Sequence, residues 1–249
     1  MASTSIAIDS GGYPHISYCN DANGDLRHAY LNSSGWHTET VDSVGYAAYY
    51  TSLALDGQGN PRISYYDATN QDLKVAHCSN TSCTGATIAT LDSINDVGSD
   101  TSITIGADGL GLISYYDLTN AGLKRAHCSN IACTSATIAA LDTVGNVGEH
   151  TSVTIGADGL GLISYYDATN GNLNYARNSL ADGSGTWTIT TVDTGGTART
   201  VARGVEIVRG LLADANRVVS CALFAEELGA LLQVRARDRA ASPVRAVVR

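Results

Sequence analysis

The chain has 249 residues and is acidic: 15 lysines and arginines stand against 24 aspartates and glutamates, a formal net charge of −9. Nucleic acids and anionic membranes bind basic patches, so this balance argues against both as partners. No apolar run approaches the roughly 20 residues that a membrane-spanning helix needs.

A twenty-residue segment is repeated along the chain. Thr101–Asn120 reads TSITIGADGLGLISYYDLTN and returns at Thr151–Asn170 with two substitutions. Looser copies begin at Ser5 and Ser52, and each copy carries a leucine 21 residues after its anchor serine. The anchor serines are spaced by 47 to 50 residues. A fixed period of this length indicates a repeat architecture.

Each copy contains four short runs with strand-like alternation, separated by turn residues. In the second copy these runs are Ser52–Asp56, Arg62–Tyr66, Leu73–Cys78 and Thr87–Leu91. Alternation of period two places successive side chains on opposite faces of a sheet, and helix periodicity is absent from the repeats. Four strands per repeat of this length are typical of a β-propeller blade.

The sequence therefore predicts an all-β fold of four four-stranded blades, over residues 3–42, 51–92, 101–142 and 151–193. Ser93–Asp100 and Thr143–His150 are assigned to linkers between blades. The first repeat begins at its innermost strand and the last ends at its outermost, so no blade is shared by the two ends. We accordingly expect an open arc or partial propeller with uncovered blade faces.

Four of the six cysteines bracket the turn between the third and fourth strands of repeats two and three. Cys78 and Cys83, and likewise Cys128 and Cys133, lie close enough along a hairpin to form local disulfides. A zinc site is the alternative, but adjacent blades would hold the two pairs apart. Cys19 and Cys221 have no counterpart and are expected to be free.

The disulfides predict an oxidising, extracellular or cell-surface location. The chain opens with Met1-Ala2-Ser3 directly before a strand, so no signal peptide is recognised at its start, and the location stays open on this point.

The corresponding turn of repeat four, Ser179–Trp187, reads SLADGSGTW. It resembles a degenerate Asp box, the hairpin found in sialidase-like propellers. Together with the SYYD segments, it makes residues 3–193 resemble bacterial sialidase-like or fucose-lectin-like propellers. The resemblance implies a catalytic set of three arginines, a Tyr/Glu nucleophile pair and an aspartic acid. The repeats hold four arginines at non-equivalent positions and two glutamates, so we expect no enzyme activity, cofactor or metal site.

A Tyr-Tyr-Asp motif recurs in three repeats and is the best candidate for ligand binding. An aromatic ring beside a carboxylate suits a sugar, which stacks on the ring and donates hydroxyl hydrogen bonds. The structural alternative has the aspartate close an Asx turn and the tyrosines fill the space between blades. Calcium at these turns is a third option. The candidate ligand-binding residues are Tyr66, Asp67, Tyr116, Asp117, Tyr166 and Asp167.

Histidines occur at equivalent positions in repeats two and three, His77 and His127, where the other copies have Tyr30 and Arg177. Because the residue type varies, they are interpreted as packing on a strand face. The sequence thus predicts a non-catalytic, lectin-like module that binds glycans. The alternative is a structural or protein-interaction scaffold of a larger surface protein, which binds a protein partner or self-associates through open blade edges. A glycosidase relic is less favoured.

The composition changes at about residue 197. The chain before this point has 19 acidic and 6 basic residues, whereas residues 197–249 contain nine arginines, no lysine and five acidic residues. Apolar residues between Val218 and Leu232 follow helix spacing, which predicts an appended helix covering blade four. The alternative, which the composition favours, is a shifted reading frame or an annotation artefact, because arginine and alanine without lysine appear where a fifth blade should start.

Overall fold

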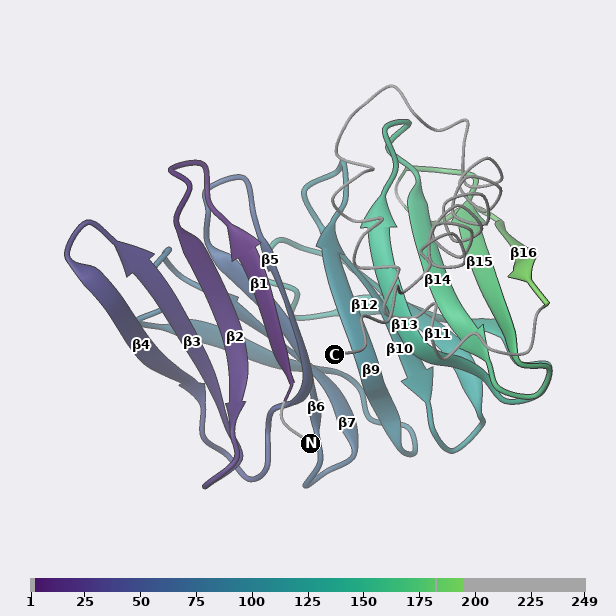
Figure 1. Cartoon of the computed structure of the whole chain (residues 1–249), viewed down its shortest axis with the longest axis horizontal. Coiled ribbons are helices and arrows are strands. Elements are labelled where there is room, and N and C mark those ends of the chain that lie inside the picture. Colours follow the sequence, from purple (N-terminus) through teal and green to yellow (C-terminus); the bar gives the residue numbers. More distant parts are fainter. Residues whose placement is uncertain (1–2, 182, 195–249) are drawn as a thin grey trace, which may run out of the picture. The chain divides into compact units, whose positions relative to one another are not determined.

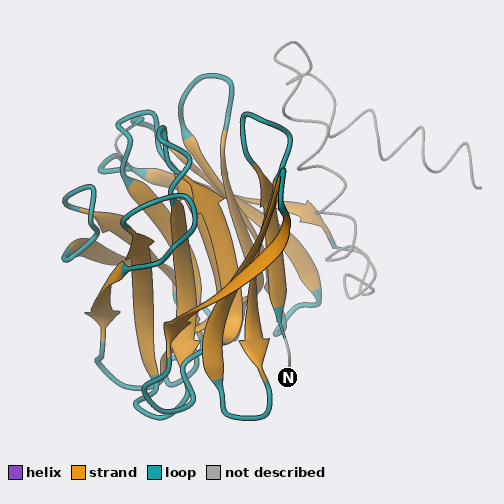
Figure 2. Ribbon diagram, turned by 90° about the vertical axis from the view of Figure 1, so that its left-hand side faces the viewer, coloured by secondary structure: helices purple, strands orange, loops and turns teal. Residues whose placement is uncertain are grey.

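The computed structural model describes residues 3–181 and 183–194. The predicted tail 197–249, with its helix and Cys221, lies outside these residues. Within them every regular element is a β-strand, as Figure 2 shows. No helix of this part is long and apolar enough to span a membrane.

The sixteen strands form four separate antiparallel sheets, each made of four strands that are consecutive in the chain. We number these sheets blades 1 to 4, and Figure 1 shows them in order from purple to green. Blade 1 contains β1 (Thr4–Ile8), β2 (Pro14–Asn20), β3 (Asp25–Asn32) and β4 (Gly35–Asp42); blade 2 contains β5 (Tyr49–Leu55), β6 (Pro61–Asp67), β7 (Asp72–Cys78) and β8 (Ala86–Asp92). Blade 3 contains β9 (Val97–Ile105), β10 (Gly111–Asp117), β11 (Gly122–Cys128) and β12 (Ala136–Asp142); blade 4 contains β13 (Val147–Ile155), β14 (Gly161–Asp167), β15 (Asn172–Asn178) and β16 (Trp187–Asp193). The all-β prediction of four four-stranded blades is confirmed.

The first strand of blades 2, 3 and 4 begins earlier than the repeat suggests. Strands β9 and β13 start at Val97 and Val147, inside the segments that the sequence assigned to linkers. The amide of Val97 donates to the carbonyl of Gln71, and that of Val147 to the carbonyl of Ala121, so each strand is anchored to the preceding blade. Register shifts then interrupt the pairing before the repeated Thr-Ser pair. Because these bulges interrupt the period-two alternation of side chains, the sequence pattern does not show where the strand begins.

Glycine is required where the new strand crosses the preceding blade. Gly98 and Gly148 have φ of 103° and 105°. A Cβ atom on either would approach the backbone of Leu73 or Leu123, with Cα separations of 2.8 and 2.7 Å. Close contact between successive blades and the left-handed backbone both exclude a side chain here.

Apolar side chains pack between successive blades rather than within one. Leu26 of blade 1 shares a core with Leu53 and Ile63 of blade 2, and all three are at most 4% exposed. Equivalent cores lie between blades 2 and 3 and between blades 3 and 4. Burial of one such side chain contributes about 1.5–3 kcal/mol, so these interfaces hold the repeats together.

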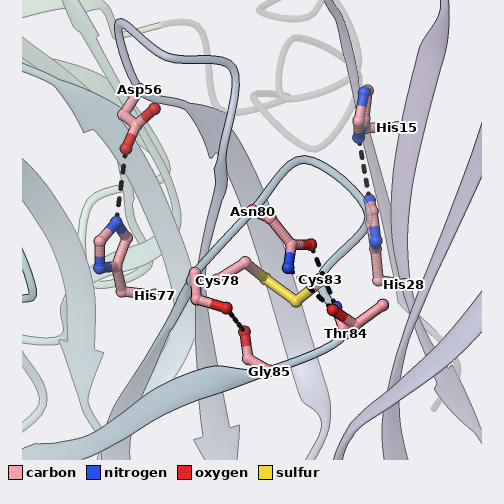
Figure 3. Close-up of a disulfide and its surroundings, with 10 residues drawn as sticks. His15, His28, Asp56, His77, Cys78, Asn80, Cys83, Thr84 and Gly85 are labelled. Atoms are coloured by element: carbon pink, nitrogen blue, oxygen red, sulfur yellow. Dashed lines mark hydrogen bonds and ion pairs between the residues drawn. A yellow bond between two sulfur atoms is a disulfide. The ribbon is translucent and has the colours of Figure 1, made fainter.

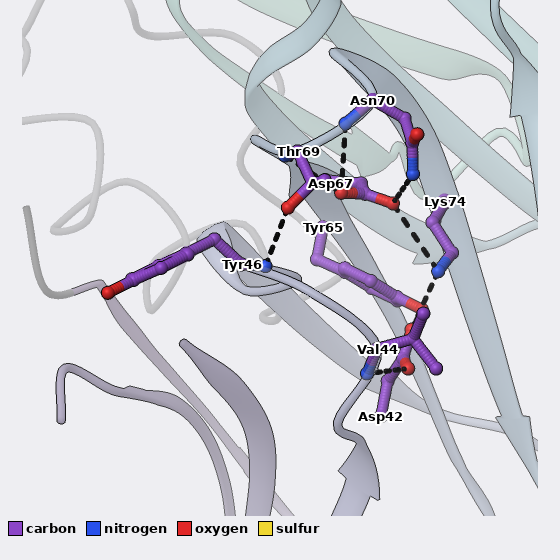
Figure 4. A network of polar contacts seen from close by, with 8 residues as sticks. All are labelled: Asp42, Val44, Tyr46, Tyr65, Asp67, Thr69, Asn70 and Lys74. Atoms are coloured by element: carbon purple, nitrogen blue, oxygen red, sulfur yellow. Dashed lines mark hydrogen bonds and ion pairs between the residues drawn. The ribbon is translucent and has the colours of Figure 1, made fainter. Parts of the chain in front are cut away.

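A buried polar network crosses each of these interfaces. Asp42, at the end of blade 1, accepts hydrogen bonds from Tyr65 Oη and Lys74 Nζ of blade 2, both at 2.7 Å (Figure 4). Lys74 Nζ also lies 3.6 Å from Asp67 Oδ2. Blade 3 repeats the arrangement with Asp92, Tyr115 and Lys124; in blade 4 Tyr165 donates to Asp142 and Asn174 replaces the lysine.

Hydroxyl groups form a second set of bonds between blades. Thr51 Oγ1 donates to Ser17 Oγ at 2.8 Å, and the amide of Leu53 donates to Ser5 Oγ at 3.0 Å. The next two interfaces repeat both bonds, with Thr101–Ser64, Ile103–Ser52, Thr151–Ser114 and Val153–Ser102. The anchor serines of the sequence repeat therefore mark contacts between blades.

Both predicted disulfides are present. Cys78 pairs with Cys83, with a Cα separation of 4.8 Å (Figure 3). Cys128 pairs with Cys133, with a Cα separation of 4.9 Å. The predicted free thiol of Cys19 is also confirmed, and its side chain is buried.

We expect the double substitution Cys128→Ala with Cys133→Ala to lower the free energy of unfolding by about 2 kcal/mol, because a ring this small limits the gain in chain entropy. Urea titration of the oxidised variant and the parent protein measures this difference. The matched Cys78→Ala with Cys83→Ala variant should lose a similar amount. A loss near zero in both would show that the loops are held by their other contacts.

Candidate functional site

Three non-glycine residues with left-handed backbone occupy the same position in successive blades. Tyr50, Asp100 and His150 have φ of 54°, 51° and 54°, and each directly precedes the repeated Thr-Ser pair. Left-handed conformations are unfavourable for such residues and are often retained at functional sites. The threonine that follows is conserved among the three blades of this chain, whereas these three side chains all differ. The bulge thus presents a variable side chain from a constant framework.

The carboxyl group of Asp100 is the central feature of this region. Its side chain is 17% exposed; Oδ2 accepts a hydrogen bond from the His150 amide at 2.9 Å, and Oδ1 lies 3.8 Å from His150 Nδ1. Burial raises the pKa of Asp100 above its ordinary value, and the negative charge of Glu149 adds to the rise, against the lowering effect of His150. A carboxyl group with a raised pKa is suited to donate a proton.

Glu149 is held by a chain of hydrogen bonds that joins blades 3 and 4. Asn146 Nδ2 donates to Glu149 Oε1 at 2.9 Å, and Asn146 Oδ1 accepts from Tyr116 Oη at 2.6 Å. Burial raises the pKa of Tyr116, with further contributions from the charges of Glu149 and Asp100. The phenol of Tyr116 therefore lies within the field of both carboxylates.

Tyr50 joins blade 2 to the same group of residues. Burial raises the pKa of its phenol, followed by the charges of Asp100, Asp96 and Glu149. Its ring meets that of Tyr66 edge to face, with centroids 6.2 Å apart, and Tyr66 Oη donates to Asp96 Oδ1 at 2.8 Å. The ring of His150 stacks against Tyr166 at 6.5 Å. We call this set the carboxylate cluster: Tyr50, Tyr66, Asp96, Asp100, Tyr116, Asn146, Glu149, His150 and Tyr166.

The predicted Tyr-Tyr-Asp residues are divided by the structure. Tyr66, Tyr116 and Tyr166 belong to the carboxylate cluster. The aspartates Asp67, Asp117 and Asp167 are 1%, 3% and 4% exposed, and each bonds to the amide and side chain of the asparagine three residues later. Figure 4 shows this turn at Asp67. These hydrogen bonds are the ones expected if each aspartate closes an Asx turn, which was the structural alternative to ligand binding.

The two equivalent histidines interact with acidic residues. His77 Nε2 lies 3.4 Å from Asp56 Oδ2, and His127 Nε2 lies 3.0 Å from Asp108 Oδ2. In the described residues no group of three or more His, Cys, Asp or Glu is arranged to hold a metal ion.

Sequence reasoning overlooked Asp100, Glu149 and His150 because it placed them in linkers. One signal was available: the two residues just before the Thr-Ser pair are Tyr49-Tyr50, Ser99-Asp100 and Glu149-His150, whereas the Thr-Ser pair itself is constant. Variation at a fixed place in a repeat marks a position that is not needed by the fold.

The sequence matches no protein-family model, and no curated protein matches it. Solved structures are similar at the level of fold. A protein of unknown function from Dyadobacter fermentans superimposes with a TM-score of 0.58 at 10% identity over 77% of this chain and 68% of its own. A mutant of AofleA from Arthrobotrys oligospora gives 0.54 at 14% identity, over 76% and 56%. An α-L-arabinofuranosidase from Clostridium thermocellum gives 0.50 at 11% identity, over 77% and 72%.

Glycoside hydrolases predominate among the similar structures, which include a β-1,3-galactosidase and an endo-1,4-β-xylanase at the same TM-score of 0.50. The fold is a β-propeller. The more specific resemblance to sialidase-like or fucose-lectin-like families gains no support from these matches.

The predicted function was wrong. A non-catalytic, lectin-like module was expected because the arginine set of sialidases is missing, but the similar propellers are mostly glycosidases. The absence of one catalytic set from a propeller does not exclude another, because one scaffold supports unrelated sites.

Proposed function

We propose that the protein is a hydrolase acting on glycosidic bonds at the carboxylate cluster. The observation that carries this proposal is the pair Asp100 and Glu149, two carboxyl groups from adjacent blades of which one has a raised pKa. Glycoside hydrolysis needs two carboxyl groups with different roles. The glycosidases with the same fold add support by analogy.

In this proposal Asp100 carries the proton that is transferred to the glycosidic oxygen as the bond to the sugar breaks. Glu149 acts from the other side, either by taking a proton from the attacking water or by attacking the anomeric carbon itself. Asn146 holds the Glu149 side chain in place, and the His150 amide orients Asp100. Anomeric configuration of the product, followed by NMR, distinguishes the two roles of Glu149.

The tyrosines of the repeated motif have a role in the same proposal. The rings of Tyr50 and Tyr66 are half-buried and meet edge to face beside the carboxylates. An aromatic face next to acidic oxygens suits a sugar ring, which has one apolar side and a rim of hydroxyl groups. The two disulfides fit an extracellular enzyme that meets polymeric glycans outside the cell.

Hydrolysis of a panel of chromogenic glycosides and of arabinan, galactan and xylan tests the proposal. We expect turnover of at least one substrate, and a fall of about 10²–10⁴-fold in kcat for Asp100→Asn or Glu149→Gln, the usual contribution of acid–base catalysis. Loss of the raised-pKa group in Asp100→Asn should also remove the alkaline limb of the pH–rate profile.

Asp21→Asn is a matched control, because Asp21 is an exposed carboxylate on a turn of blade 1. It should retain the parent activity. Absence of turnover on the whole panel, or equal activity in the parent protein and both cluster variants, would refute the proposal.

A further inference from the structure

One face of blade 1 is apolar and is not covered by any of the described blades. Strand pairing places Ile6 beside Ile16, Thr4 beside Tyr18, and Tyr18 beside Arg27 on the same side of the sheet. We call this side the upstream face, consisting of Thr4, Ile6, Ile8, Ile16, Tyr18, Arg27 and Trp36. Ile6, Ile8 and Trp36 are 60%, 58% and 56% exposed.

The same positions in the other blades are covered by the preceding blade. The counterparts of Ile6 are Leu53, Ile103 and Val153, which are 4%, 1% and 0% exposed. Ile63 and Tyr65, the counterparts of Ile16 and Tyr18, are fully buried. The upstream face of blade 1 therefore has the composition of a surface that is buried between blades in three other places.

Arg27 is the charged residue of the upstream face. It stands where blades 2 and 3 have Lys74 and Lys124, whose ammonium groups bond to the last aspartate of the preceding blade. Arg27 Nε is buried without a hydrogen-bond partner, and its Nη2 bonds to Thr38 Oγ1 at 3.2 Å. This nitrogen is thus available as a donor to an acceptor on a docked surface, as the lysines of blades 2 and 3 donate to the preceding blade.

Blade 4 has the surface that would complement the upstream face of blade 1. Its downstream face consists of Ser152, Thr154, Ser164 and Asp193. In blades 1 to 3 the counterparts of these residues contact the next blade. Ser17, Ser64 and Ser114 are fully buried under the next blade, whereas Ser164 is half-buried and Asp193 is exposed. The last blade thus carries, at its surface, hydroxyl and carboxylate groups of the kind that this face contacts in the other blades.

We propose that the downstream face of blade 4 in one copy of the protein docks on the upstream face of blade 1 in a second copy. Ile6, Ile8 and Trp36 are covered in this pairing, Thr4 Oγ1 and the Ile6 amide bond to Ser164 and Ser152, and Arg27 and Tyr18 reach Asp193. The interface is the one already formed three times within the chain. Among the described residues no blade covers the upstream face, and a second copy of the chain supplies the complementary downstream face.

Because two different faces meet, the association is head-to-tail. Each copy offers one face of each kind. A variant blocked on one face can therefore still pair through the other, which makes the two faces separable by experiment.

Sedimentation velocity of the full chain over a range of concentrations tests the proposal. We expect species of at least twice the 25.9 kDa chain mass in the parent protein, growing with concentration. Ile6→Asp, which blocks the upstream face, and Thr154→Arg, which blocks the downstream face, should each sediment as monomers. An equimolar mixture of the two variants should form a dimer and nothing larger.

Ile131→Asp is the control, because Ile131 is 58% exposed on the disulfide loop, away from both faces; it should associate like the parent. Trp36→Glu replaces Ile6→Asp if circular dichroism shows that the latter is unfolded. A parent protein that stays monomeric, with its upstream face covered by its own fourth blade or by the chain after residue 194, would overturn the proposal. So would a mixture of variants that does not pair.

Discussion

Replacing Asp42 by alanine should lower the free energy of unfolding by up to about 3–5 kcal/mol, because the buried ammonium group of Lys74 loses its nearer carboxylate and keeps only Asp67, 3.6 Å away. Asp42 accepts from both Lys74 and Tyr65, and the Lys74 side chain is only 10% exposed. Although burial would raise the pKa of Asp42, these two donors hold it below its ordinary value. Urea denaturation of parent and variant at pH 7 measures the loss.

Blade 4 provides the matched control within the same chain. Asp142 accepts from Tyr165 at the corresponding interface, but Asn174 stands in place of the lysine. Asp142→Ala should therefore cost only about 1–3 kcal/mol, the penalty of one neutral buried donor. Equal losses of unfolding free energy in the two variants would show that the ion pair with lysine adds nothing to the hydrogen bond from tyrosine.

Acidification from pH 7.5 to 4.5 should destabilise the protein because a histidine is buried in the neutral form. His28 is fully buried beneath blade 2, its Nε2 is 3.1 Å from Nδ1 of His15, and Figure 3 shows the pair near the first disulfide. Burial, with the neighbouring His15, lowers the pKa of His28 to about 4. Burial also lowers the pKa of His15.

A histidine whose pKa falls on folding binds its proton more readily in the unfolded chain. Stability is therefore complete above the unfolded pKa of 6.5 and declines as the pH falls toward 4, by roughly 3 kcal/mol for a shift of this size. Free energies of unfolding at several pH values measure the slope. His28→Val, which copies Val75 of blade 2, should flatten it, whereas His37→Gln at the outer strand should not. A parent protein equally stable at both pH values would contradict this account.

The repeat made the fold readable from the sequence. Four copies of one pattern, each with a serine and a leucine 21 residues apart and with period-two alternation, predict four similar four-stranded sheets. The interblade network was also readable, since Asp42, Asp92 and Asp142 recur at the same place, as do Lys74 and Lys124. It was overlooked because the interacting residues belong to different repeats.

The candidate site could not be read in the same way. Tyr50, Asp100 and His150 lie at bulges, where the alternation that identifies a strand is broken by a left-handed residue. Their shared position depends on the pairing of β5, β9 and β13 with the next strands of their own blades. The proximity of Asp100 to Glu149 and Tyr50 follows from packing between blades, which a single repeat does not encode.

The unit of stability in this protein is offset from the unit of repetition. Asp42 is encoded in the first repeat but completes the second, and Asp92 likewise completes the third. If the DNA for one complete repeat were lost or duplicated, each aspartate would still be followed by a blade with a tyrosine to receive it. Such an event changes the number of blades without leaving a carboxylate unmatched at the new junction. Recombination between repeats can therefore vary the length of this protein in steps of one blade.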